Sequence, residues 1–467
     1  MTVKLTGDSL RLEDVLRVAR ERAPVALAAG AADRVRAARA VVEAVVEGGA
    51  PVYGVTTGVG VRKRMRVHPS ELPEFNRRLI LEHLVGQGDA APADVVRAQL
   101  LLVVNGFARG SSGVTLELVE HLISRLNDGA TPHVRTLGSI GMSDLPANAD
   151  LAHGVLDGFE LGAKEGIALL DNNAFSTALA SLALADAVAL LDSLDVAAAL
   201  DLEALAGNLS ILHRAAGRQA ATVERLRVLL AGSYLWEEGA ARNLQDPLSF
   251  RCIPNVHGAA RETLDFALAR LERELNTSQE NPIVVVDERR VISVGNFDSL
   301  PLASALDFVR IALVPVLTTA SERALKLLQA PVTGLPEGLA AEPGLPESAY
   351  SEFGVPLQAL AAEAKLLAQP VSIETGSTSH HEGIEDRMTL APLGARRLAQ
   401  LVELGERLGA IELAVAAQAI HLRGSPKLGA ETGALYARVR ELIPPLRRGD
   451  APPPDLEPLR ALLRQPT

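Results

Sequence analysis

Apolar and polar residues recur along most of this chain with the period of an α-helix. Residues 9–50 carry two such stripes, and Gly48-Gly49 ends the second. Further helices are predicted at residues 71–89, 92–107, 163–191, 257–276, 300–329, 355–369 and 385–424. Two β-rich runs, 283–286 and 290–293, are separated by an acidic pair and predict one hairpin. The predicted fold class is therefore mainly α, with a small β-hairpin.

Two segments interrupt the helical pattern with polar residues. Residues 138–153 have no clear period, which predicts an irregular loop that crosses the protein between two helices. Long buried loops are uncommon and usually functional. Asp171-Asn172-Asn173 forms a polar island in the apolar stretch 163–191, so these side chains need partners. The island is either a buried hydrogen-bond network or a functional site.

Composition narrows the class of protein. Apolar residues make up 48% of the 467 residues and aromatic residues only 3%, which predicts an aliphatic core of closely packed helices. The net charge of -11 argues against nucleic acid or an anionic membrane surface as a partner. A single cysteine, Cys252, excludes an internal disulfide and fits the reducing cytoplasm. No uncharged apolar run reaches about 18 residues, so no membrane span is expected.

Several polar residues are candidates for chemistry but are weak signals alone. Tyr53 lies in the glycine-rich segment 51–60, where backbone bends tightly or approaches a ligand closely. The basic segment 62–66 is either a solvated loop or a lid that attracts anions. The adjacent histidines 380–381 lie among acids within residues 375–386. Neighbouring loop residues seldom face one ion, so no metal site is expected.

Several blocks, in the right order, resemble the histidine and aromatic amino acid ammonia-lyase family. Tyr53-Gly54, with glycines at 58 and 60, resembles the loop that carries the catalytic tyrosine of the family. The other matching blocks are Leu81-Glu82-His83, Asn105 to Val114, Ala163 to Asn172, Gln245 to Pro254, Glu274 to Pro282, Gly295-Asn296-Phe297 and Glu385-Asp386. The resemblance covers nearly the whole chain, and the order of the blocks makes it specific.

The resemblance implies an architecture and an assembly. The fold would be the long central antiparallel helix bundle of the ammonia-lyase (fumarase/aspartase-like) type. Residues 1–195 would form an N-terminal helical domain with the active-site loops, and residues 196–467 the long-helix bundle with a C-terminal helical cap. The protein would be a homotetramer with active sites shared between chains. Its partner would be a small-molecule amino acid derivative, without nucleic acid or membrane.

The resemblance also assigns roles to residues. Tyr53 would be the general base, with a pKa lowered by the basic segment 62–66. The catalytic set would be Tyr53, Ser143 and Glu385. The substrate-binding set would be His83, Asp171, Asn172, Gln245, Arg251 and Phe297. Arg251 would hold the substrate carboxylate in a bidentate contact.

Departures from the family pattern are informative. In the family, Ala-Ser-Gly cyclises and dehydrates into methylidene-imidazolone (MIO), the electrophile of the reaction. Here the triad is Met142-Ser143-Asp144, and Asp144 lacks the freedom that lets glycine accept the ring closure. No prosthetic group is therefore expected. Leu248 replaces a tyrosine of the family, and Asp171 replaces an asparagine.

The favoured function is a carbon–nitrogen lyase that eliminates an amine from an imidazole or aromatic amino acid derivative. It is similar to MIO-independent ergothionase, which eliminates trimethylamine from ergothioneine. A quaternary amine leaves as a neutral molecule, and four extra acids would favour such a cation. These acids are Glu82, Asp144, Asp150 and Asp171. The alternatives are a conventional ammonia-lyase or aminomutase with an atypical electrophile, and a non-catalytic homologue.

Overall fold

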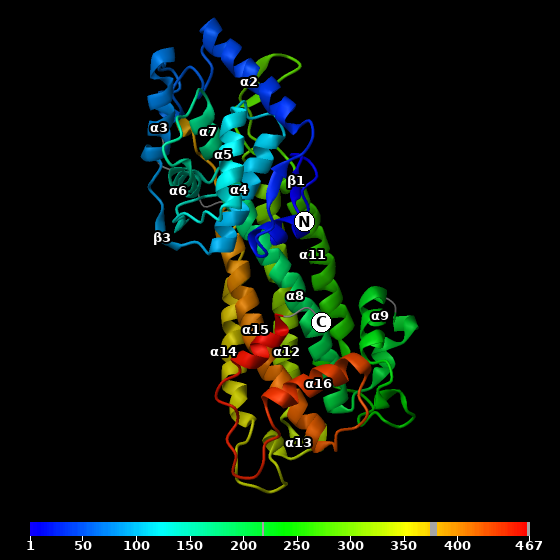
Figure 1. The fold of residues 1–467 in the computed structure, drawn as a ribbon. Coiled ribbons are helices and arrows are strands. Elements are labelled where there is room, and N and C mark those ends of the chain that lie inside the picture. Colours follow the sequence, from blue (N-terminus) through cyan, green and yellow to red (C-terminus); the bar gives the residue numbers. More distant parts are fainter. Residues whose placement is uncertain (217–218, 374–380, 465–467) are drawn as a thin grey trace. The chain divides into compact units, whose positions relative to one another are not determined.

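The computed structural model describes residues 1–216, 219–373 and 381–464 and is mainly helical, as predicted (Figure 1). The N-terminal helices are α1 (Leu12–Ala19), α2 (Ala31–Gly48), α3 (Leu72–Glu82), α4 (Ala93–Ala108), α5 (Leu116–Asn127), α6 (Leu145–Leu156) and α7 (Glu165–Leu170). The long helices are α8 (Ala174–Leu205), α11 (Ile253–Leu275), α12 (Leu300–Leu327), α14 (Gly354–Leu367) and α15 (Ala391–Leu422). The shorter helices are α9 (Ala220–Leu229), α10 (Leu248–Arg251), α13 (Ala330–Thr333), α16 (Ala430–Leu442) and α17 (Glu457–Leu463).

In the part of the chain that the structure describes, the strands form three small two-stranded sheets. The predicted hairpin is confirmed as β5 (Ile283–Val285) and β6 (Arg290–Ile292), which pair antiparallel. The other pairs are β1 (Val3–Leu5) with β2 (Val25–Leu27), parallel, and β3 (Gln87–Ala90) with β4 (Arg135–Leu137), antiparallel. Strands β1 to β4 have only three or four residues, so an alternation of apolar and polar positions did not reveal them in the sequence.

The chain folds into two compact units built from discontinuous segments. Unit 1 contains Met1–Ala183, Ala267–Asp307 and Pro370–Arg396. Unit 2 contains Leu184–Phe266, Phe308–Gln369 and Arg397–Thr467. Four of the five boundaries fall within the four longest helices, α8, α11, α12 and α15, and the fifth follows the end of α14.

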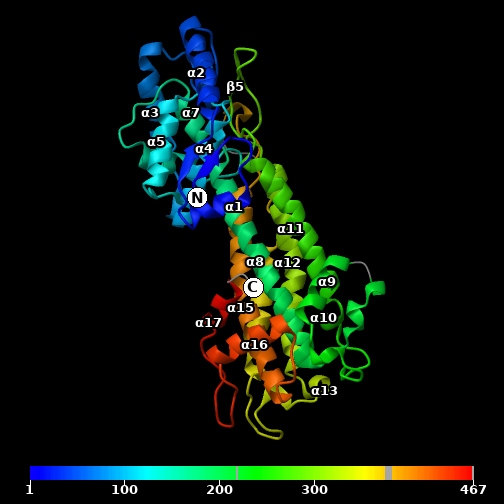
Figure 2. The ribbon, with the colours of Figure 1, turned by 45° about the vertical axis from the view of Figure 1, so that its right-hand side comes forward.

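In unit 1, the inner face of α2 anchors two segments that matter for the site. Val41 and Val42 of α2 share an apolar cluster with Val55 and with Val284 of β5. Figure 2 shows β5 beside α2. Burial of these valines, at about 25 cal/mol per Å² of apolar surface, fixes the loop that contains Tyr53.

In unit 2, a charged cluster joins three helices inside an apolar core. Arg323 of α12 is fully buried and donates to Asp201 of α8 and to Glu412 of α15, each at 2.7 Å. Removal of Arg323 would leave two buried acids without a countercharge, so this arginine holds the three helices together at this point.

Among the described residues, two helical stretches are long and apolar enough to cross a membrane, although the sequence has no uncharged apolar run of about 18 residues. They are Glu165–Leu205 and Leu300–Leu327, and 78% and 56% of their most apolar windows are buried inside the protein. Such burial is typical of core helices.

The prediction of an irregular loop over residues 138–153 is wrong for most of its length. Helix α6 occupies Leu145–Leu156, and the irregular part of the stretch ends at Asp144. Pro146 lies in the first turn of the helix, where a missing backbone N–H has no consequence. The proline and the small residues around it therefore mark the start of a helix rather than a loop.

The polar island also has a different setting from the one predicted. Helix α7 ends at Leu170 and α8 begins at Ala174, so the island is a junction between helices. Asn172 makes this junction: its Oδ1 accepts from the Ala174 amide at 3.0 Å. Its amide group donates to the carbonyls of Ala168 and Leu169 at 3.1 Å. Asn172 thus satisfies backbone groups that the helix ends leave open.

Candidate active site

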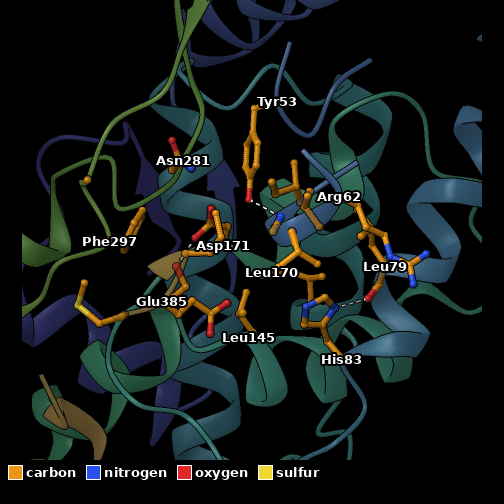
Figure 3. Close-up of a pocket in the computed structure, with 18 of the residues that line it drawn as sticks. Tyr53, Arg62, Leu79, His83, Leu145, Leu170, Asp171, Asn281, Phe297 and Glu385 are labelled. Carbon is orange, nitrogen blue, oxygen red and sulfur yellow. Dashed lines mark hydrogen bonds between the residues drawn. The ribbon is translucent and has the colours of Figure 1, made fainter. Parts of the chain in front are cut away.

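A cavity of about 470 Å³ lies entirely within unit 1 (Figure 3). Six residues singled out in the sequence line it: Tyr53, His83, Ser143, Asp171, Phe297 and Glu385. They come from segments far apart in the sequence, so only the fold brings them together. A mostly apolar cavity with a few convergent polar groups is the usual form of a small-molecule site.

Tyr53 projects its ring into the cavity, and its hydroxyl faces the same space as Asp171 and Glu385 (Figure 3). The phenolic oxygen accepts a hydrogen bond from the Gly60 amide at 2.9 Å. Burial raises the pKa of Tyr53, the Gly60 amide partly opposes this, and the charges of Asp171 and Glu385 raise it further. The free site therefore keeps the phenol protonated.

The prediction that the basic segment 62–66 lowers the pKa of Tyr53 is wrong. Lys63 and Arg64 instead pair with Glu382, at 2.9 and 3.0 Å. Arg66 donates to the carbonyl of Gly49. Arg62 lines the cavity, but the pKa of Tyr53 is set by burial, the Gly60 amide and the charges of Asp171 and Glu385.

Ser143 and Asp171 form a hydrogen-bonded pair on the cavity wall. The hydroxyl of Ser143 donates to Oδ1 of Asp171, and its amide donates to Oδ1 of Asn173 at 3.0 Å. Ser143 has φ of +64°, a conformation that costs a non-glycine residue roughly 1 kcal/mol or more.

The carboxyl of Asp171 holds a proton far more tightly than an ordinary aspartate. Burial raises its pKa to about 7; the hydrogen bond from Ser143 opposes the rise, and the charge of Glu280 adds to it. Lys164 and Asn281 favour the ionised form. Near neutral pH this group therefore exchanges between its acid and its carboxylate.

His83 offers a hydrogen-bond acceptor to the cavity. Its Nδ1 lies 2.7 Å from the carbonyl oxygen of Leu79, so Nδ1 carries the hydrogen and donates it (Figure 3). In the neutral ring, Nε2 is then the acceptor. A heterocyclic N–H of a ligand suits this nitrogen.

Three predicted substrate-binding residues lie outside this cavity. Asn172 serves the helix junction described above. Gln245 and Arg251 belong to unit 2 and do not line the cavity. The guanidinium of Arg251 donates from Nε to the carbonyl of Asp246 at 2.8 Å.

Of the four extra acids predicted near the site, two line the cavity and two do not. Glu82 and Asp171 line it. Asp144 is buried and accepts from the Ser176 hydroxyl at 2.8 Å. Asp150 accepts from Arg135 and is occupied by that ion pair.

Some other residues that line the cavity belong to the matched family blocks, but the sequence analysis assigned them no role. The sequence analysis did not single out the remaining lining residues. Asn281 accepts from the Val294 amide through Oδ1 at 2.8 Å and also hydrogen-bonds to Asp171. Arg387 pairs with Asp298 on the same wall. The matching blocks around Asn281 and Arg387 were the available signal. The apolar lining includes Leu79, Met142, Leu145, Ile167, Leu170 and Ile384.

The histidine pair at 380–381, considered above as a metal site, begins outside the described residues. Residues 375–380 lie outside the described part of the chain. Within residues 1–216, 219–373 and 381–464, no group of three or more His, Cys, Asp or Glu side chains is placed to hold a metal ion.

Comparisons with known proteins identify what this geometry resembles. The aromatic amino acid lyase family model matches residues 10–159 and 144–441. Histidine ammonia-lyase of Stigmatella aurantiaca is 35% identical over 477 residues, which cover 96% of this chain and 93% of that protein. Ergothionase from Treponema denticola has a TM-score of 0.92 at 28% identity and 99% coverage of both chains. Histidine ammonia-lyase from Trypanosoma cruzi has a TM-score of 0.90 at 29% identity, covering 99% of this chain and 93% of that one.

These comparisons correct the expectation that the enzyme uses no prosthetic group. The relatives are histidine ammonia-lyases, and they point to the MIO-dependent family. In this structure the Asp144 amide, the nitrogen that ring closure requires, donates to the Asn172 carbonyl at 2.9 Å. This conformation of residues 142–144 does not fit the group.

The resemblance predicted from the sequence blocks is confirmed. The family model spans most of the chain, and a relative is more than 30% identical over nearly its whole length. The mainly helical fold agrees with the solved structures. The chain belongs to the aromatic amino acid lyase family and is a carbon–nitrogen lyase.

Proposed function

We propose that this lyase eliminates trimethylamine from an N-trimethylated imidazole amino acid such as ergothioneine. The observation that carries the proposal is the placement of the Tyr53 hydroxyl in one cavity with Asp171 and Glu385, two carboxylates that attract a fixed cation. The phenolate of Tyr53 takes the proton from the β-carbon. The electron pair of that C–H bond forms the new C=C bond, and the C–N bond breaks to release a neutral amine.

The charge balance of the cavity favours a cationic ligand. Two arginines line it, and Arg387 is already paired with Asp298. Five acids line it: Glu82, Asp171, Asp298, Glu385 and Asp386. A bound quaternary ammonium would offset this surplus and lower the raised pKa of Tyr53, so the substrate itself would help to generate the base. The quaternary nitrogen has no lone pair and needs no deprotonation before it leaves.

His83 and Arg251 would orient the two ends of the substrate. Nε2 of His83 would accept from the imidazole N–H. Arg251 would hold the carboxylate, supplied to this cavity by another copy of the chain in a homotetramer. We place this assembly in the cytoplasm, in keeping with the single cysteine.

The solved ergothionase supports the trimethylated substrate, because it is an ergothioneine-degrading enzyme with the same fold over 99% of both chains. The second candidate is deamination of histidine itself, which the names of the relatives at 35% identity favour. The two candidates differ in the leaving group: trimethylamine in one and ammonia in the other.

The test is to incubate the enzyme with histidine, its trimethyl betaine and ergothioneine. The absorbance of the unsaturated product and the identity of the released amine are both followed. Trimethylamine from a betaine supports the proposal, and Tyr53→Phe provides the matched inactive control. Ammonia from histidine with both betaines unreacted overturns it in favour of the second candidate.

A further inference from the structure

Lys164 and Glu280 form a buried ion pair behind the cavity wall. Nζ of Lys164 lies 3.3 Å from Oε2 of Glu280, and the two residues are 0% and 5% exposed. Oε1 of Glu280 accepts from the hydroxyl of Ser112. Neither Lys164 nor Glu280 lines the cavity, but both charges act on Asp171, which does.

These three groups comprise two acids and one base. If all are ionised, the cluster carries one surplus negative charge in a poorly solvated place, which is costly. A proton on Asp171 removes the surplus in the free enzyme. A cationic group in the cavity would remove it equally well. Asp171 is the member of the cluster that a ligand can reach.

We propose that Asp171, Lys164 and Glu280 exchange a proton for the cationic amine of the substrate. Asp171 holds the proton in the free enzyme and releases it to solvent when the amine binds beside its carboxylate. Lys164 and Glu280 act through Asp171 and are positioning residues. The inference rests on the proposed function, which supplies a ligand with a permanent positive charge.

The surroundings of Asp171 place this exchange in the neutral range. Ser143 and Asn281 hydrogen-bond to the carboxyl, while Tyr53 and Glu385 share its cavity. With a pKa of about 7 in the free site, Asp171 is mostly protonated at pH 6 and mostly ionised at pH 8. Affinity for a cation should therefore rise with pH and level off above about 7, where there is no proton left to displace.

The experiment is calorimetry of histidine trimethyl betaine binding at pH 6.5, in buffers of different ionisation enthalpy. A Tyr53→Phe background keeps the ligand unreacted. We expect release of roughly half a proton or more per site. Asp171→Asn, added to Tyr53→Phe, should lower the number of protons released on binding by the same half proton or more. Any proton that the imidazole ring of the ligand gains or loses is the same with and without Asp171→Asn. Glu288→Gln, an equal charge change on the exposed hairpin turn, should leave the count unchanged.

Lys164→Met removes the compensating charge. It should weaken betaine binding at pH 6.5 by tenfold or more and move the levelling of affinity to higher pH. Equal proton release with and without Asp171, or an affinity that does not change between pH 5.5 and 8, overturns the inference. The measurement of affinity against pH needs no substitution at Asp171, Lys164 or Glu280. Failure of the betaine to bind contradicts both proposals, whereas binding without trimethylamine release in the enzyme that retains Tyr53 contradicts only the proposed function.

Discussion

The hydroxyl of Ser143 donates to Oδ1 of Asp171, which joins the segment before α6 to the end of α7 on one wall of the cavity. This bond favours the carboxylate form of Asp171 and so opposes the effect of burial. The protonation state of Asp171 therefore depends in part on the Ser143 hydroxyl, besides burial and the charges of Glu280 and Lys164.

Ser143→Ala should raise the pKa of Asp171 above its value of about 7. Since the carboxylate is the form that binds a cation, betaine affinity should fall most at pH 6–7 and recover at higher pH. Titration of affinity against pH checks this, with Ser139→Ala, a nearby serine outside the cavity lining, as the control. Parallel pH profiles for the variant and the parent enzyme would argue that the hydroxyl does not act on Asp171.

Tyr53→Phe should lower kcat by roughly two to four powers of ten, because the base is lost. Binding of the substrate should change little, since the hydrogen bond of the phenolic oxygen with the Gly60 amide lies within the protein. Steady-state kinetics and calorimetry separate the two effects. Tyr234→Phe, whose hydroxyl bonds to the Glu203 carbonyl in unit 2, is a matched control. Near-normal turnover without Tyr53 would move the base elsewhere.

His83→Phe should weaken binding of imidazole substrates by roughly tenfold, about the free energy of one hydrogen bond. The ring would keep its volume but lose both the bond to Leu79 and the acceptor nitrogen. Comparison with a betaine that lacks ring nitrogens tests the cause, because that ligand should lose no affinity. Equal losses for both ligands would indicate a packing defect instead.

Arg251 and Tyr53 lie in different units. We predict that Arg251 of one copy of the chain completes the site that contains Tyr53 of another copy. Arg251→Lys should weaken substrate binding, since a point charge cannot replace a planar fork. Tyr53→Phe and Arg251→Lys chains, expressed together, should regain part of the activity through mixed assemblies. Lack of any recovery, in mixtures shown by mass to contain both chains, would contradict the shared site.

Periodicity was sufficient to predict the long helices and the hairpin. It was insufficient where local composition misled: Pro146 and the small residues around it indicated a loop but begin α6. The polar residues 171–173 predicted either a buried hydrogen-bond network or a site, and the side chain of Asn172 belongs to a network that closes the junction between α7 and α8. In both cases, helix-end chemistry determines the structure, and an average over a window of residues conceals it.

The residues of the candidate site were accessible through family blocks, but their electrostatics were not. The basic segment next to Tyr53 in sequence suggested a lowered pKa. Burial instead raises the pKa of Tyr53, and the charges that add to the rise belong to Asp171 and Glu385, more than a hundred residues away along the chain. Lys164 and Glu280 act on Asp171 by the same kind of long-range proximity. Such effects depend on distances that only the fold defines.

The most direct test of the account is the identity of the amine released from a betaine substrate. The enzyme is mixed with histidine trimethyl betaine or ergothioneine, and volatile amines are identified by mass while the product absorbance is followed. The account predicts one trimethylamine for each unsaturated product, released by Tyr53→Phe at a rate lower by roughly two to four powers of ten. Release of ammonia from histidine, with neither betaine consumed, would contradict it.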